Sequence, residues 1–263
     1  MKYLKRLRLR KYRIQEQAFL VEGIQQVWRA LEHGAPVQTL VVAPDLLSSD
    51  SARALVADQR GQGMRVVTVS RAIFEDTTER EHPAGLAAVV GIEERSLTDL
   101  VLSPDAFVVA LEEVGNPGNL GSIIRSVDAT GGSGVILVGA ATDPWHPVAV
   151  KASVGTLFTV PVCRASGIDE LADWAAAQGF DLVATSAHAD LPYWEHGYEL
   201  PSIFLFGSEA QGLDEETLSR SSARIRIPMS GSATSLNLAV SVGIVLYELR
   251  RRRPSKGETD RAG

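Results

Sequence analysis

Residues 108–125 read VVALEEVGNPGNLGSIIR, an apolar, strand-like run that enters a glycine-rich turn and then a helix. Such a turn presents backbone N–H groups to a ligand at the start of the helix. The three glycines are spaced GxxGxxG rather than GxGxxG, so the dinucleotide-binding signal is weak. Asn119 and Arg125 are under two helical turns apart, so both side chains can face one cleft. A turn asparagine and a surface arginine are the simpler interpretation, which this segment alone favours.

A second apolar strand ends in a turn that carries a carboxylate. Residues 204–214 read FLFGSEAQGLD, and Glu209 precedes a helix expected over 214–219. The carboxylate can bind backbone amides at the start of that helix. It can also hold a ligand or a catalytic partner at the carboxyl end of a parallel strand. Both interpretations stay open.

The third segment is rich in small, hydrogen-bonding residues. Residues 225–243 read IRIPMSGSATSLNLAVSVG, and a long last helix is expected over 236–252. Ser235 can cap this helix, and Asn237 then lies in its first turn. An asparagine in the first turn of an apolar helix requires a partner if it is buried.

Apolar strands alternate with helices around these segments. Continuous apolar strands separated by helices predict an α/β fold with a mostly parallel sheet covered on both faces. The expected helices lie near 119–130 and 168–178, and the expected strands at 107–111, 135–138, 158–162, 182–185, 203–206 and 225–227.

The first 93 residues form a second, smaller α/β block. Apolar residues recur at helical spacing and predict a helix over 14–33, and strands are expected at 37–43, 64–69 and 86–92. The polar run 94–103 is expected to be a linker. The predicted organisation is an N-terminal domain over 1–93, this linker, a second domain over 104–253 and a disordered tail over 254–263.

Charge is unevenly distributed along the chain. The formal net charge is −6, yet the N-terminal segment and residues 250–253 are strongly basic. Such ends can contact RNA phosphates, although a solvated helix face fits the charges equally well. The candidate RNA-binding residues at the N-terminus are Lys5, Arg8, Arg10, Lys11 and Arg13.

Composition excludes several other classes of protein. No apolar run is long enough to span a bilayer, and no apolar segment follows the basic N-terminus as in a secretory signal. Cys163 is the only cysteine, which fits a reducing cytoplasm. The five histidines show no metal-ligand spacing with cysteine, so no metal site is expected.

Taken together, the three segments resemble the SpoU/TrmH family of RNA 2′-O-ribose methyltransferases in the SPOUT superfamily. The matching stretches are NPGNLGSIIR, LFGSEAQGL and IPMSGSATSLNLAVSVGIVLYE, within residues 105–252. Residues 1–93 are similar to the family's ribosomal-protein-like substrate-binding domain through FLVEG at 19–23 and GLAAVV at 85–90. Relatives often have Pro-Gln-Gly where this chain has PAG at 83–85.

The resemblance implies a second domain threaded as a trefoil knot, which binds S-adenosylmethionine among the knot loops. It implies that the protein methylates a ribose 2′-hydroxyl of structured RNA, above all 23S-type ribosomal RNA, as a homodimer. A tRNA substrate and a non-catalytic RNA-binding role remain as alternatives, and so does another nucleotide-using α/β enzyme such as a dehydrogenase. The residues expected to line the cofactor pocket are Thr185, Gly207, Ile227 and Leu236.

The resemblance also assigns the central catalytic role to Arg125. Because a guanidinium keeps its proton near neutral pH, we expect Arg125 to grip the phosphate beside the target ribose and to stabilise the developing alkoxide. The residues expected to orient Arg125, the ribose and the methionine moiety are Asn119, Glu209, Ser235 and Asn237.

Overall fold

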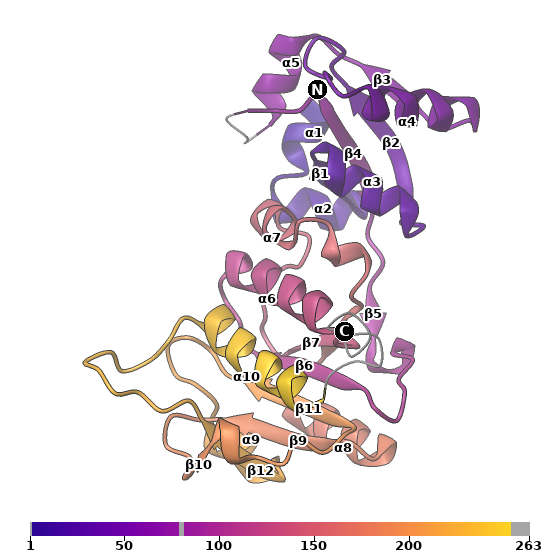
Figure 1. The fold of residues 1–263 in the computed structure, drawn as a ribbon. Helices are drawn as coiled ribbons and strands as arrows, with labels where there is room; N and C mark the ends of the chain where they lie inside the picture. The colour runs from indigo at the N-terminus through magenta and orange to yellow at the C-terminus, as the bar shows by residue number, and fades with distance from the viewer. Residues whose placement is uncertain (1, 79–81, 254–263) are drawn as a thin grey trace, which may run out of the picture. The chain divides into compact units, whose positions relative to one another are not determined.

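The computed structural model describes residues 2–78 and 82–253, which form two compact units (Figure 1). The first unit comprises residues 1–93 and 143–159, and the second comprises residues 94–142 and those from 160 onward. The segment 143–159 therefore belongs with the N-terminal residues, although the chain on both sides of it belongs to the second unit. In these two described ranges, no helix has both the length and the apolar character needed to cross a membrane.

The first unit is a four-stranded sheet with helices on both faces. The strand order is β1-β4-β2-β3, with β4 antiparallel to both neighbours and β3 parallel to β2. Helices α3 and α4 pack on one face, and α1 and α5 pack on the other. The elements are α1 (Lys2–Arg6), α2 (Arg10–Glu16), β1 (Ala18–Glu22), α3 (Ile24–Glu32), β2 (Val37–Val42), α4 (Asp50–Gly61), β3 (Val66–Thr68), α5 (Arg71–Thr77) and β4 (Leu86–Gly91).

The single helix predicted over 14–33 is wrong, because β1 interrupts it. Gln17 has a left-handed φ of 46° and ends α2, and Gly23, with φ 109°, turns the chain from β1 into α3. Phe19 and Leu20 are buried on opposite faces of the sheet. A strand buried on both faces is apolar at every position, so apolar spacing alone does not separate it from a helix.

Segment 143–159 completes the core of the first unit with α7 (Pro147–Ser153) and the 3-10 helix η2 (Thr156–Phe158). Val150 and Phe158 pack into the core on the side of α3, and the rings of Phe19 and Phe158 stack with centroids 6.3 Å apart. The strand predicted over 158–162 is therefore wrong at its start, because η2 includes Phe158 and the strand begins only at Val162.

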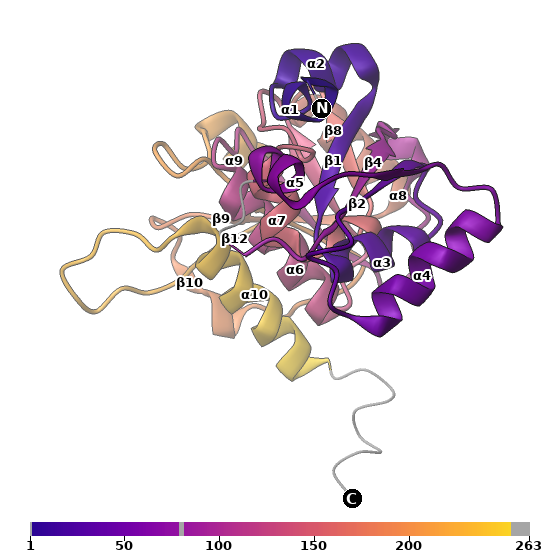
Figure 2. The ribbon, with the colours of Figure 1, turned by 90° about the horizontal axis from the view of Figure 1, so that it is seen from above.

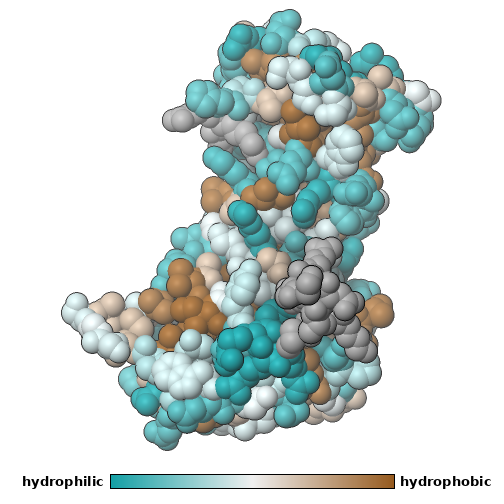
Figure 3. Space-filling view, in the orientation of Figure 1, coloured by the Kyte–Doolittle hydropathy of each residue, from teal (hydrophilic) through white to brown (hydrophobic). Residues whose placement is uncertain are grey.

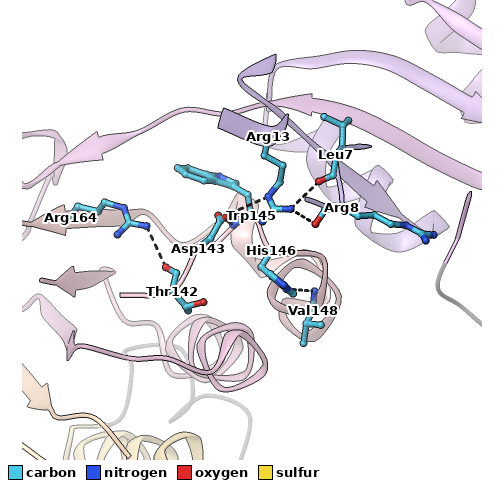
Figure 4. A network of polar contacts seen from close by, with 9 residues as sticks. All are labelled: Leu7, Arg8, Arg13, Thr142, Asp143, Trp145, His146, Val148 and Arg164. Atoms are coloured by element: carbon cyan, nitrogen blue, oxygen red, sulfur yellow. Dashed lines mark hydrogen bonds and ion pairs between the residues drawn. The ribbon is translucent and has the colours of Figure 1, made fainter. Parts of the chain in front are cut away.

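A buried ion pair joins this segment to the N-terminal helices (Figure 4). Arg13 is 1% exposed and donates from Nε and Nη2 to Oδ2 of Asp143, at 3.0 Å and 2.7 Å. Its Nη1 donates to the backbone carbonyls of Leu7 and Arg8, at 2.9 Å and 2.6 Å. Removing one partner of a buried pair leaves a charge without compensation, which typically costs about 3–5 kcal/mol.

The second unit confirms the predicted parallel α/β fold. Its described residues form an eight-stranded sheet of order β10-β12-β9-β11-β6-β7-β8-β5 in which the pairings are parallel. Residues 94–103, expected as a linker, contribute the edge strand β5 and the 3-10 helix η1 (Leu97–Asp99). The strands are β5 (Arg95–Ser96), β6 (Phe107–Glu112), β7 (Gly134–Val138), β8 (Val162–Ala165), β9 (Asp181–Thr185), β10 (Leu191–Pro192), β11 (Ser202–Phe206) and β12 (Ala223–Arg226).

Helices cover both faces of this sheet (Figures 1 and 2). α8 (Ile168–Gln178) and α9 (Glu215–Arg220) pack on one face through Leu171 and Leu218. α6 (Pro117–Thr130) and α10 (Leu238–Arg252) lie on the other face and pack against each other. From β6 the chain adds β7 and β8 on one side, and β11 and β9 lie on the other. Ligand sites in α/β sheets form beyond the carboxyl ends of strands where the order changes direction in this way.

Candidate active site

Asn119 connects the three motifs found in the sequence. Asn116 caps α6 by accepting from the backbone N–H groups of Gly118 and Asn119, at 2.8 Å and 3.2 Å, which fixes Asn119 in the first turn. The Asn119 side chain is buried, its Nδ2 donates to Oε1 of Glu209, and its Oδ1 accepts from Nδ2 of Asn237 at 3.0 Å. One amide thus links the loops that follow β6, β11 and β12.

Asn237 has a second task as the cap of α10. Its Oδ1 accepts from the backbone N–H groups of Ala239 and Val240, at 3.0 Å and 3.3 Å. Because Oδ1 serves the helix, the amide nitrogen points toward Asn119. The sequence prediction placed Asn237 inside the helix and Ser235 at the cap, whereas α10 begins one residue after Asn237.

Arg125 and Ser235 are both exposed. Arg125 lies on α6, and within residues 2–78 and 82–253 its guanidinium has no hydrogen-bond or ion-pair partner. Ser235 lies in the loop before α10 and lines the adjacent pocket. Both side chains are available to a substrate.

A pocket of about 490 Å³ includes Glu209 and Ser235 in its lining and is formed by the loops after β9 and β11 and by the start of α10, whereas Arg125 is not part of the lining. Thr185, Gly207 and Leu236 line it, as the resemblance implied, and Ile227 lies outside its lining. Sequence reasoning missed the polar lining residues Ser186, His188, Gln211, Glu215 and Arg224. Ser186, His188 and Gln211 lie in loops beyond the carboxyl ends of parallel strands, which is a signal that predicts such residues, whereas Arg224 lies within β12 and Glu215 begins α9.

Gly207 sets the shape of this pocket. A Cβ atom at this position would lie 2.1 Å from the carbonyl carbon of Gly212 and 2.3 Å from the backbone nitrogen of Leu213. The loop 207–213 therefore folds back onto its own start, and Gly212 N–H donates to the carbonyl of Ser208 at 2.9 Å. Only glycine permits this approach of backbone to backbone.

The charges of the pocket suit a small cationic ligand. Glu209 and Glu215 line it, and the one arginine in the lining, Arg224, donates its Nε to the carbonyl of Leu218 at 3.1 Å. Apolar side chains and serine and threonine residues make up much of the remaining lining. Two carboxylates oppose a polyphosphate, whereas they favour a positively charged sulfur or ammonium group.

Comparisons with known proteins identify the family. The model of the SpoU rRNA Methylase family matches residues 106–247, a span that includes Asn119, Glu209, Asn237 and the whole pocket. The chain belongs to the SpoU rRNA methylase family. A second family model, the MRM3-like substrate binding domain, matches residues 1–88.

Individual SpoU relatives align over both units. The chain is 34% identical over 242 residues to the 23S rRNA (uridine(2479)-2′-O)-methyltransferase of Streptomyces viridochromogenes, over 90% of this chain and 84% of the relative. It is 30% identical over 249 residues to the 23S rRNA (guanosine(2553)-2′-O)-methyltransferase RlmP of Bacillus subtilis, over 94% of both. The crystal structure of the SpoU methyltransferase AviRb from Streptomyces viridochromogenes with the cofactor AdoMet matches with a TM-score of 0.86 and 32% identity, over 97% of both chains.

In this SpoU domain, Glu112 supports the loop that forms the pocket. Glu112 ends β6, and its Oε1 accepts from Oγ1 of the fully buried Thr217 at 2.6 Å. The backbone N–H of Thr217 donates at 2.8 Å to Asp214, the cap of α9 at the end of the loop. Burial raises the pKa of Glu112, the Asp214 and Glu113 charges raise it further, and the Thr217 hydrogen bond opposes these effects.

We expect Glu112→Gln to change how stability depends on pH. Since folding raises the Glu112 pKa above its ordinary value of 4.5, the folded state holds this proton more tightly, and stability is lost as pH rises through the folded pKa. The variant lacks this loss, so its unfolding free energy relative to the wild type rises with pH above 4.5. Urea denaturation of both proteins at pH 4 to 7 measures this difference in unfolding free energy. The exposed Glu216 on α9 provides the control, Glu216→Gln. A difference that does not vary with pH contradicts this assignment.

The basic residues expected to bind RNA differ in accessibility. Lys5, Arg10 and Lys11 are exposed, and Lys5 forms a surface ion pair with Asp76 at 2.6 Å. Arg8 is half-buried and donates to the carbonyl of Thr77. Arg13 requires a correction, because its guanidinium is buried on Asp143 and reaches no phosphate. Charge alone did not separate a buried ion pair from a surface cation.

Proposed function

We propose that this chain transfers a methyl group from S-adenosylmethionine to a ribose 2′-hydroxyl of 23S-type ribosomal RNA. The observation that carries the proposal is the Asn119 amide, which binds both Glu209 and Asn237 beside a pocket whose lining carries two carboxylates and one guanidinium. The two curated relatives named above act on 23S rRNA and align with both units of this chain, which favours ribosomal RNA over tRNA.

The residues divide the work between cofactor and RNA. Bound S-adenosylmethionine supplies an activated methyl group on a positively charged sulfur. The pocket residues Thr185, Gly207 and Leu236 hold it, and the nearby carboxylates favour its charge. Asn119 uses both its donor and its acceptor, which keeps Glu209 and Asn237 from rotating.

Arg125 acts on the RNA. Its exposed guanidinium grips the phosphate beside the target ribose through paired N–H groups and stabilises the negative charge that develops on the 2′-oxygen. A guanidinium keeps its proton at neutral pH, so Arg125 is not the base. The exposed Ser235 hydrogen-bonds to the ribose or to the methionine moiety at the mouth of the pocket.

The decisive experiment measures labelled methyl transfer from S-adenosylmethionine to unmodified 23S rRNA and to tRNA, followed by digestion to nucleosides. We expect a labelled 2′-O-methyl nucleoside from 23S rRNA. Label in tRNA alone supports the tRNA alternative. No label with intact cofactor binding supports the non-catalytic alternative, and no cofactor binding overturns the proposal.

We also propose that a second copy of the chain covers the exposed apolar side of α10. Val240 and Tyr247 on this helix are 49% and 59% exposed, and Figure 3 shows hydrophobic surface near its N-terminal end. We expect a mass in solution of twice 28.3 kDa by light scattering, and a monomer for Val240→Lys with Tyr247→Lys. The control is Ile73→Lys, at an apolar residue on α5 that is 40% exposed. A monomeric wild type contradicts the homodimer.

Two further proposals follow from family membership. We propose that the second unit is threaded as a trefoil knot, which is in keeping with the insertion of β11 between β6 and the earlier strand β9. We propose a cytoplasmic location, since an enzyme that methylates ribosomal RNA must be in the compartment that contains this RNA.

A further inference from the structure

The first unit contains a groove that the methyl-transfer chemistry does not use. It encloses about 500 Å³ where α1 and α2 leave part of the sheet uncovered. Val41, Val67 and Val89 lie on the adjacent strands β2, β3 and β4 and form an apolar floor. Tyr3 and Leu4 come from α1 and Glu16 from the end of α2, and Thr39 and Arg65 complete the lining.

The lining combines an apolar surface with one carboxylate and one guanidinium. Tyr3 is 39% exposed and offers an aromatic ring beside the valine floor. Glu16 and Arg65 are exposed, and no hydrogen bond or ion pair engages the Arg65 guanidinium anywhere in residues 2–78 or 82–253. Proteins recognise unpaired RNA bases with surfaces of this kind. The base stacks on the aromatic side chain, and polar side chains form hydrogen bonds to the edges of the base.

Guanine matches the two charged groups of the groove. It carries two N–H donors side by side, on N1 and the 2-amino group, and a carboxylate accepts both. Its O6 and N7 are adjacent acceptors, which a guanidinium binds with two N–H groups. Adenine and cytosine present one amino group beside an acceptor, and uracil has no amino group, so Glu16 favours guanine.

The charge around the groove favours RNA as the occupant. The helices that line it also carry exposed cations that can contact the phosphates on either side of a bound base. These residues are Lys2, Lys5, Arg6, Arg10 and Lys11.

We propose that this groove binds an unpaired guanine of the substrate RNA, with the base between Tyr3 and the valine floor, Glu16 on its N1 and 2-amino edge and Arg65 on O6 and N7. The proposal rests on the proposed function only in taking RNA as the substrate. The groove therefore adds base-specific recognition to the phosphate contacts of the N-terminal helices.

Binding of heptanucleotides to the full chain tests this, with UUUGUUU compared with the same sequence carrying A, C or U in the centre. We expect guanine to bind about tenfold tighter than the other bases, as for a good two-bond contact. Glu16→Gln is expected to reduce this preference, and the part that remains comes from the Arg65 contact to O6 and N7. Tyr3→Ala weakens binding of the guanine oligonucleotide about tenfold, since stacking on an aromatic residue has an effect of that size. Arg65→Ala does the same, because it removes the two-bond contact to O6 and N7.

The matched control is Arg60→Ala. Arg60 is an exposed arginine on α4, which packs on the opposite face of the sheet, so the variant changes charge equally without touching the groove. A 6-thioguanosine in the central position is expected to cross-link to the peptides that contain Tyr3 or Val67. Equal binding of all four oligonucleotides, or equal effects of Arg60→Ala and Arg65→Ala, overturns the proposal.

Methyl transfer to 23S rRNA, measured on the same proteins, separates the two ideas. If the wild-type protein transfers methyl groups but shows no guanine preference, the proposed function is supported and the proposal that the groove binds guanine is contradicted. If the protein shows a guanine preference that depends on Glu16 but transfers no methyl group, the guanine-binding proposal is supported and the proposed function is contradicted.

Discussion

Gly207→Ala is expected to weaken S-adenosylmethionine binding by about 10- to 100-fold, since forcing an extra methyl group into packed structure costs about 1–3 kcal/mol. The new methyl group would lie 2.2 Å from the carbonyl oxygen of Gly212, closer than any real contact, and this oxygen is a backbone atom that no side-chain rotation can move away. Loop 207–213 must therefore open, which changes the wall of the pocket and the position of Glu209. Isothermal titration of the folded variant with S-adenosylmethionine measures the loss.

Gly115→Ala is the matched control for this substitution. Gly115 lies in the turn before α6, near the same end of the sheet, and a Cβ there meets nothing within 4 Å. We expect wild-type affinity for this variant. Wild-type affinity in Gly207→Ala as well would show that the loop does not shape the cofactor pocket.

Arg125→Lys is expected to reduce methyl transfer about 100-fold and to leave S-adenosylmethionine affinity unchanged, a loss typical of removing one preorganised donor from a transition state. Lysine keeps the charge but loses the planar pair of N–H groups that binds a phosphate. Single-turnover transfer to 23S rRNA separates this step from cofactor binding.

Arg220→Lys provides the control for Arg125→Lys. Arg220 is an exposed arginine on α9, paired with Asp169 on α8, and α8 and α9 cover the other face of the sheet. Its variant should turn over normally. Normal turnover in Arg125→Lys too would show that charge alone is sufficient.

Sequence patterns predicted the second unit well because its strands are buried on both faces. The runs 107–111 and 203–206 are apolar throughout, and the structure places β6 and β11 there. The same property prevented the prediction of β1 as a strand, since Ala18, Val21 and Ile24 also fit a helical spacing. The spacing of apolar residues does not reveal which elements cover a segment, and this tertiary packing decides between a strand and a helix.

The candidate site was predicted as three motifs but not as one network. The resemblance assigned Asn119, Glu209, Ser235 and Asn237 to orienting one substrate, whereas the central place of Asn119 depends on the caps at Asn116 and Asn237, which set the direction of the side chains. Ile227 was carried over by position and lies outside the pocket lining. The burial of Arg13 depends on its ion pair with a residue far along the chain, Asp143, so local sequence could not predict it.

The return of segment 143–159 to the first unit affects the order of events during synthesis. A ribosome that has released residues 1–93 has not yet made Phe158, which stacks on Phe19, or Asp143, which compensates the buried guanidinium of Arg13. The N-terminal core therefore lacks these contacts until about residue 159 has emerged, when β6 and β7 have already been synthesised. A fragment that ends at Glu93 lacks the same contacts permanently. Strands of the second unit are thus synthesised before the first unit has all of its residues.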